Sequence, residues 1–340
     1  MSNNVLNLYP IDYPFESLVQ RVDKNKLKLD PHFQRVYKWN KDGEVKTSRF
    51  IESALMRIPL PACYFAEDDE NNHLVIDGVQ RITTIVRFFK DEFALKGLTA
   101  YKELNGKKFS ELGKYKNELE SYTIRCIILR NDNKQQLVQD IFARLNQGGV
   151  SLTPQEIRHA LYPGNLDSLL SKLAQNTNIS KFGLGKNGSR KKDGLQNEEQ
   201  VLRFFAMKGD LSDYNGIMDK YLDVFMINNQ HISDSDTALL QQRFCETLEK
   251  CIFVFKDDVF VDINKEKRRQ SMAYYDLLMW SFEKLDFEFI KNHSDEIVEA
   301  FNSMCLIEDF QKTVYSGVQK KYAIIKRRKI WEEKLSGINE

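Results

Sequence analysis

Helical periodicity and short apolar runs alternate along the first half of the chain. Apolar residues recur at helical spacing over 44–58 and again in a helix that begins near Val79. Short apolar runs at 62–65 and 73–76 predict strands, and a longer run at 122–129 predicts a strand of the core. The pattern therefore predicts a region in which strands and helices are mixed.

Helix boundary signals are clear around residue 150. A helix expected over 134–145 is followed by Gly148-Gly149, which supplies a left-handed cap. Thr153 and Glu156 then form a capping box, with Pro154 at the first helical position. Another helix is therefore predicted to start at this point.

Strand patterns become rare after residue 165, where long amphipathic segments dominate. These segments cover 198–207, 218–226, 239–255 and 271–282. A stretch rich in Gly, Lys and Asn at 180–197 is typical of an exposed loop. We therefore predict an α+β fold with two domains, a mixed domain at 1–165 and a mainly α-helical domain at 166–340.

Composition narrows the class of protein only slightly. The 340 residues include 50 basic and 49 acidic side chains, so the net charge of +1 gives no general attraction to nucleic acid. The 5 cysteines are scattered without a CxxC pair, which predicts reduced core residues and neither a disulfide framework nor a zinc site. Because the chain shows no basic-then-apolar leader and no bilayer-length apolar run, we expect a cytoplasmic protein with no membrane partner.

The first candidate site is the junction between the run at 73–76 and the following helix. Unpaired N–H groups and the helix dipole make such a helix start favourable for phosphate. Gly78 lets the backbone approach an anion closely, and the Arg81 guanidinium can bind two oxygens at once. The Asp77 carboxylate beside them could hold a metal ion or orient a water.

A purely structural interpretation of this junction is equally open. Asp77 could cap the helix, with Gln80 as its capping-box partner and Arg81 as a solvated charge. Since an exposed arginine at a helix start should contribute little to stability, Arg81→Ala is expected to weaken nucleotide affinity without unfolding the chain. A large drop in melting temperature of the ligand-free variant would instead support the structural interpretation.

Two further segments combine arginine with motif-like patterns. Large aromatics at 33–39 surround Gln34 and Arg35, and packing on the core would explain the aromatics but not these two polar residues. Arg144 and Arg158 flank a sharp turn and could close on an anion. Singly, each is more typical of a surface or ion-paired residue.

Together these motifs resemble the N-terminal domain of GmrSD-type modification-dependent restriction endonucleases, which has a ParB/sulfiredoxin-like fold. The matching segments are Phe33-Gln34-Arg35-x-Tyr37-x-Trp39, Ile58-Pro59-Leu60-Pro61, Asp77-Gly78-Val79-Gln80-Arg81-Ile82-Thr83-Thr84, Phe142-x-Arg144-Leu145-Asn146-x-Gly148-Gly149 and Leu152-Thr153-x-Gln155-Glu156-x-Arg158. Several such segments in order and with plausible spacing are more specific than any one alone. The helical second half is similar to the extension that usually follows this domain.

The resemblance implies a nucleotide-binding and NTP-hydrolysing module of bacterial defence against phage or foreign, often modified, DNA. It places a nucleoside triphosphate of unassigned identity and Mg²⁺ or a similar divalent cation at the junction, with Asp77 as metal ligand and Asp77, Gln80 and Arg81 as catalytic residues. Val79 replaces the first Gln of the family's Asp-Gly-Gln-Gln-Arg motif, which removes a side chain that could contact phosphate or water. The remaining residues expected to bind nucleotide are Gly78, Gln34, Arg35, Arg144 and Asn146.

Relatives commonly carry a C-terminal His-Asn-His nuclease domain, which needs clustered histidines, whereas the 5 histidines of this chain are isolated. We therefore expect DNA, and a separate nuclease or effector protein, as partners, and leave a homo-oligomer open. The basic loop Arg190-Lys191-Lys192 is the first candidate for DNA contact, followed by Lys267-Arg268-Arg269 and Lys326-Arg327-Arg328-Lys329. The rival functions are a non-hydrolysing sensor or specificity subunit and a metal-dependent DNA nuclease.

Overall fold

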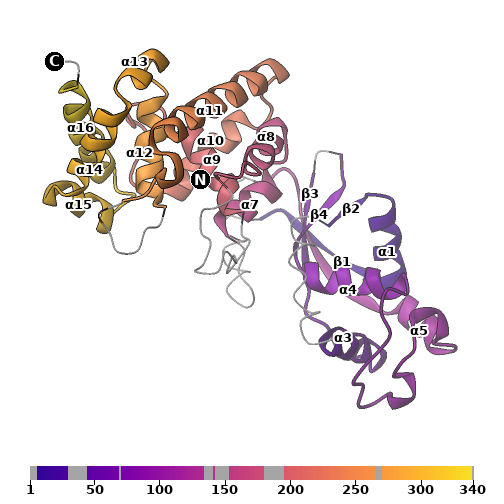
Figure 1. Ribbon diagram of the computed structural model, residues 1–340. Coiled ribbons are helices and arrows are strands. Elements are labelled where there is room, and N and C mark those ends of the chain that lie inside the picture. Colours follow the sequence, from indigo (N-terminus) through magenta and orange to yellow (C-terminus); the bar gives the residue numbers. More distant parts are fainter. Residues whose placement is uncertain are drawn as a thin grey trace. The chain divides into compact units, whose positions relative to one another are not determined.

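The computed structural model describes residues 6–29, 44–68, 70–133, 141, 153–179, 195–262, 264 and 270–338 (Figure 1). The chain divides into two units, Met1–Ser151 and Leu152–Glu340, each with its own hydrophobic core. The division falls before the helix that starts at Pro154, whereas the sequence pattern placed the boundary after residue 165.

The first unit contains a five-stranded mixed sheet in the order β1-β5-β3-β4-β2. Its strands are β1 (Leu8–Pro14), β2 (Leu27–Lys28), β3 (Cys63–Glu67), β4 (His73–Asp77) and β5 (Thr123–Leu129). The pairs β1–β5 and β3–β4 are antiparallel, and the pairs β3–β5 and β2–β4 are parallel. The three strands predicted from apolar runs are thereby confirmed, and they form the centre of the sheet.

Helices cover one face of this sheet. They are α1 (Phe15–Asp23), α3 (Val45–Leu55), α4 (Val79–Phe89) and α5 (Tyr115–Ser121), with short 3₁₀ turns at Lys102–Leu104 and Phe109–Glu111. Residues that alternate along the strands, such as Cys63, Phe65 and Val75, pack with the apolar faces of these helices. The resulting core fixes where α4 leaves the sheet, which is the junction of interest.

The second unit is helical throughout the part that the structure describes, apart from an isolated bridge between Val261 and Gln270. Its helices are α7 (Pro154–Leu161), α8 (Asn165–Leu173), α9 (Gln196–Ala206), α10 (Met218–Asn229), α11 (Asp234–Phe255), α12 (Met272–Phe282), α13 (Phe287–Asn292), α14 (Ser294–Cys305), α15 (Glu308–Tyr315) and α16 (Lys321–Ser336). A 3₁₀ turn at Lys256–Asp258 follows α11. The predicted α+β region followed by a mainly helical one is confirmed.

The start of α7 bears out the boundary signals in the sequence. Thr153 Oγ1 accepts from the backbone N–H of Glu156 at 3.2 Å, and the Glu156 carboxylate accepts from the N–H of Thr153 at 2.6 Å. This reciprocal capping box satisfies two N–H groups that the helix cannot pair. Among the described helices, none combines the length and the apolar character needed to cross a membrane.

Candidate functional site

Asp77 and Arg81 form an ion pair at the junction between β4 and α4. Asp77 is the last residue of β4, Gly78 is the N-cap, and α4 begins at Val79. The Arg81 guanidinium donates through Nη2 to Asp77 Oδ2 at 2.5 Å. The Arg81 side chain is only 13% exposed, whereas that of Asp77 is 40% exposed. The junction therefore presents a partly exposed carboxylate that is paired with a largely buried cation.

The same guanidinium also binds the segment that leads into β3. Its Nη1 donates to the carbonyl oxygens of Pro61 and Ala62, at 2.5 and 3.1 Å. Arg81 is therefore not the solvated helix-start charge that the structural interpretation expected. These backbone acceptors were not foreseen from the sequence, although Pro61 belongs to the Ile-Pro-Leu-Pro motif that could have drawn attention to this segment.

Gly78 is required by the conformation and packing of the turn. Its φ of +98° lies in the left-handed region, and a Cβ at this position would come within 2.4 Å of Cys63 Sγ. No side chain caps α4, so the interpretation in which Asp77 and Gln80 form a capping box is wrong. Gln80 lies in the first turn of α4, where its carbonyl accepts from Thr84 Oγ1 at 2.7 Å.

Two buried thiols lie beneath this turn. Cys63 and Cys126 are direct partners in the parallel pair β3–β5. The hydrogen bond to Cys63, together with burial, raises the pKa of the Cys126 thiol. All 5 cysteines are free, and 4 of them are buried, whereas Cys245 is only partly buried. A raised pKa favours the protonated thiol, which suits Cys126 to packing under the junction.

The described residues contain no group of three or more His, Cys, Asp or Glu side chains that converge on one point. At this junction Asp77 could hold a divalent cation together with ligands from a bound molecule. Mg²⁺ commonly binds in this way, through one or two carboxylates plus substrate phosphates and water. The donor set at Asp77 fits a cation that arrives with phosphates.

Several predicted site residues lie outside the described residues. They are Gln34, Arg35, Arg144, Asn146, Arg190, Lys191, Lys192 and the run Lys267-Arg268-Arg269. Their assignments to the nucleotide pocket or to DNA contact therefore remain predictions.

Arg158 is ion-paired, as the structural alternative expected. Its side chain is fully buried, and it donates to the carboxylates of Glu199, Asp219 and Asp223 at 3.2, 3.1 and 2.7 Å. The Gln155 side chain accepts a further bond at 3.0 Å. These contacts commit the guanidinium to joining α7, α9 and α10, so Arg158 does not offer an anion clamp.

The basic run at 326–329 is not a continuous cationic surface. Arg327 donates to the carbonyls of Thr313 and Val318, and Arg328 binds that of Gly209 while lying 4.3 Å from the centre of the Trp280 ring. Burial lowers the pKa of both guanidinium groups to about 10. The two arginines tie α16 into the helical core, and the prediction that they contact DNA is wrong.

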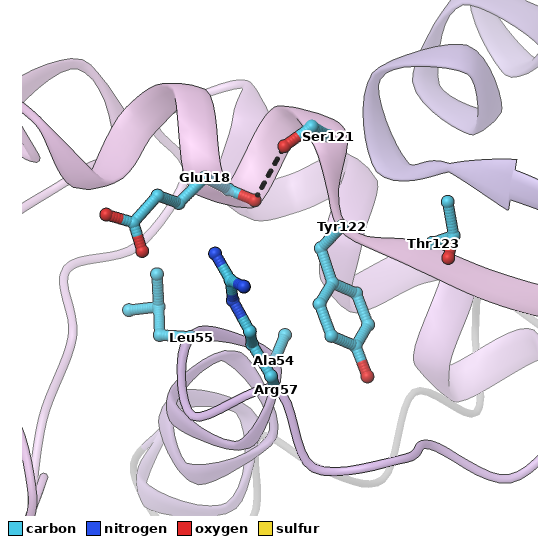
Figure 2. A pocket seen from close by; sticks show the side chains of 7 residues that line it. All are labelled: Ala54, Leu55, Arg57, Glu118, Ser121, Tyr122 and Thr123. Atoms are coloured by element: carbon cyan, nitrogen blue, oxygen red, sulfur yellow. Dashed lines mark hydrogen bonds between the residues drawn. The ribbon is translucent and has the colours of Figure 1, made fainter.

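A cleft of about 420 Å³ lies between the end of α3 and the end of α5 (Figure 2). Arg57, in the left-handed conformation with φ of +57°, points from the end of α3 toward the helix that carries Glu118. Tyr122 lines the cleft and donates through its hydroxyl to the Ile58 carbonyl at 2.6 Å. The segment 58–62 is thereby held by Tyr122 at one end and by Arg81 at the other.

The fold and the junction define an α+β domain with a carboxylate–guanidinium pair where a central strand passes into a helix, followed by a helical unit. Residues 15–163 match the family model described as the GmrSD restriction endonuclease, N-terminal domain. This part of the chain is therefore similar to the N-terminal domain of GmrSD-type restriction endonucleases. The family's C-terminal nuclease domain was not detected. No curated protein and no solved structure matched the chain.

Proposed function

We propose that the protein binds a nucleoside triphosphate at the Asp77–Arg81 junction and hydrolyses it within a bacterial system that restricts phage or other foreign DNA. One observation carries this proposal. Within a GmrSD-type domain, a 40%-exposed carboxylate at the end of β4 adjoins both a guanidinium and the N-terminus of an 11-residue helix. Helix starts with a nearby arginine favour phosphate oxygens.

Each residue of the junction has a role in this proposal. Asp77 would hold a divalent cation that neutralises charge on the phosphates, and Arg81 would supply the second positive charge. Gly78 shapes the turn, and Gln80, in the first turn of α4, would orient a water. A change in nucleotide state would be passed to the helical unit and to a separate nuclease or effector that acts on DNA.

Phosphate release by the purified protein tests the hydrolase. ATP, GTP, CTP and UTP would each be supplied with magnesium, with and without modified DNA, and we expect release with at least one of them. Asp77→Ala should abolish it. The matched control is Asp23→Ala, because Asp23 is also a partly exposed acid in an ion pair, 2.7 Å from Lys90 just after the other end of α4.

A non-hydrolysing sensor or specificity subunit is the second candidate, and Val79 favours it. An apolar side chain begins α4 at the position where the family motif has a glutamine that could hold water or phosphate. In this case the wild type would bind nucleotide yet release no phosphate, with or without DNA. That result would exclude the hydrolase function and would still support the nucleotide-binding site.

A further inference from the structure

In the protein without ligand, the Asp77 carboxylate and the Arg81 guanidinium, which are proposed to bind a metal–nucleotide complex, bind each other instead. Arg81 Nη2 lies 2.5 Å from Asp77 Oδ2, so the carboxylate that would bind a cation already has one, and the guanidinium that would bind phosphate already has an anion. A ligand that uses the same Nη2 donor or the same Oδ2 acceptor must displace this contact.

We propose that the Asp77–Arg81 ion pair is an autoinhibitory latch that makes binding of the divalent cation and of the phosphates interdependent. The proposal rests on the proposed nucleotide site. A phosphate chain without metal that binds Nη2 takes this donor from Asp77 and leaves the carboxylate uncompensated beside an anion. A cation that binds Asp77 removes the competitor and frees the guanidinium.

The other contacts of Arg81 make the exchange feasible. Nη1 is held by the carbonyls of Pro61 and Ala62, at 2.5 and 3.1 Å, and neither bond involves Asp77. These two bonds keep the guanidinium at the junction while Nη2 changes its partner from carboxylate to phosphate. Opening of the latch therefore needs a local change at Asp77 rather than withdrawal of the whole arginine side chain.

The latch predicts that removal of the Asp77 charge strengthens binding of nucleotide without metal. Asp77→Asn should raise the affinity for at least one of ATP, GTP, CTP and UTP, each measured separately in EDTA by calorimetry, by about fivefold, as expected for loss of a partly exposed ion pair. The magnesium dependence of binding should shrink in the same variant. Asp23→Asn, which breaks the pair with Lys90, should change neither quantity.

Simple repulsion between Asp77 and the phosphates would also produce a gain, and a double-mutant cycle separates the two causes. Arg81→Met removes the guanidinium and keeps an apolar stem that can still pack. If Asp77 acts by holding Arg81, the gain from Asp77→Asn is large in the wild type and small in the Arg81→Met background. If Asp77 only repels phosphate, the gain is at least as large in Arg81→Met, where no cation shields it.

Three outcomes decide the matter, with the melting temperature of each variant as the check on folding. A gain confined to the Arg81-containing protein supports the latch. The latch is overturned if Asp77→Asn gives no gain in affinity, or if the gain persists in Arg81→Met. In that case, binding of nucleotide by the wild type with magnesium still supports the proposed function. Absence of binding by the wild type in both magnesium and EDTA overturns the nucleotide site and the latch together. If Arg81→Met fails to fold, Arg81→Gln takes its place in the cycle and is judged by the same two outcomes.

Discussion

Arg81 shows how one side chain can belong to a candidate site and to the scaffold at once. Its three hydrogen bonds join the end of β4, the start of α4 and the segment before β3. A charge that is 13% exposed and bonded in this way contributes to stability, in contrast to the solvated arginine expected from the sequence. Loss of function in an Arg81 variant therefore has to be separated from loss of structure.

Arg81→Ala should lower the free energy of unfolding by about 1–3 kcal/mol, because two backbone carbonyls and a carboxylate lose a charged donor. Chemical denaturation of the ligand-free protein measures this change. Lys90→Ala is the control, since the Lys90 side chain is 46% exposed and its pair with Asp23 is worth at most about 1 kcal/mol. Equal stabilities of the two variants would show that the Arg81 bonds carry no weight in solution.

Gly78→Ala should destabilise the protein more than an ordinary turn substitution. The left-handed φ of +98° costs a residue with a Cβ about 1–2 kcal/mol, and the added atom meets Cys63 Sγ at 2.4 Å. Cys63→Ala in the same chain should recover the steric part and leave the backbone part. A Gly78→Ala protein with the wild-type melting temperature would contradict this account of the turn.

At the scale of elements, sequence periodicity located the central strands and the helix after β4, because burial on one face leaves a regular apolar pattern. The capping box at Thr153 was also predictable, since both partners lie within one turn. The contacts of Arg81 with Pro61 and Ala62 were not, because they depend on sheet order. Antiparallel pairing of β3 with β4 brings the segment before β3 beside the start of α4, and no local pattern encodes that pairing.

His73, the first residue of β4, should make the stability of the first unit depend on pH. His73 is buried against Phe65, and burial is the main cause that lowers the pKa of its imidazole, with the Arg21 cation adding to the shift. The folded protein therefore binds the proton less well than the unfolded chain does. Stability is fully present above the ordinary histidine pKa, about 6.5, and falls as the pH drops below it.

We expect His73→Gln to flatten the decrease in the free energy of unfolding between about pH 7 and pH 5, since histidine titrates in this interval. Urea denaturation at a series of pH values measures the slope. His293→Gln is the control, because His293 is the partly exposed N-cap residue of α14 and pairs with Glu296. Parallel pH curves for wild type and His73→Gln would assign the acid sensitivity to other groups.

At the scale of the whole molecule, the two units have separate cores and separate buried polar centres. Arg158 is one such centre in the helical unit, and its removal would leave the carboxylates of Glu199, Asp219 and Asp223 without their shared cation. Loss of one member of a fully buried pair typically costs about 3–5 kcal/mol, and the cost here is smaller because the three carboxylates are 20–59% exposed. The consequence should be confined to the unit that contains it.

Arg158→Met should therefore accelerate hydrogen exchange in α7, α9 and α10 while leaving the exchange of α4 and the β-sheet unchanged. Mass spectrometry of peptides from each unit measures both in one experiment. Nucleotide binding by the variant serves as a second readout of the first unit. Uniform acceleration across the chain would show that the two cores unfold as one.

The segment 58–62 has a further consequence for altering this protein. It is fastened by the Tyr122 hydroxyl at Ile58 and by the Arg81 guanidinium at Pro61 and Ala62, and its two prolines stiffen it between those points. A segment that is held at both ends cannot accept extra residues without losing one of these hydrogen bonds. A peptide tag or protease site inserted there would be tolerated far less well than its surface position suggests.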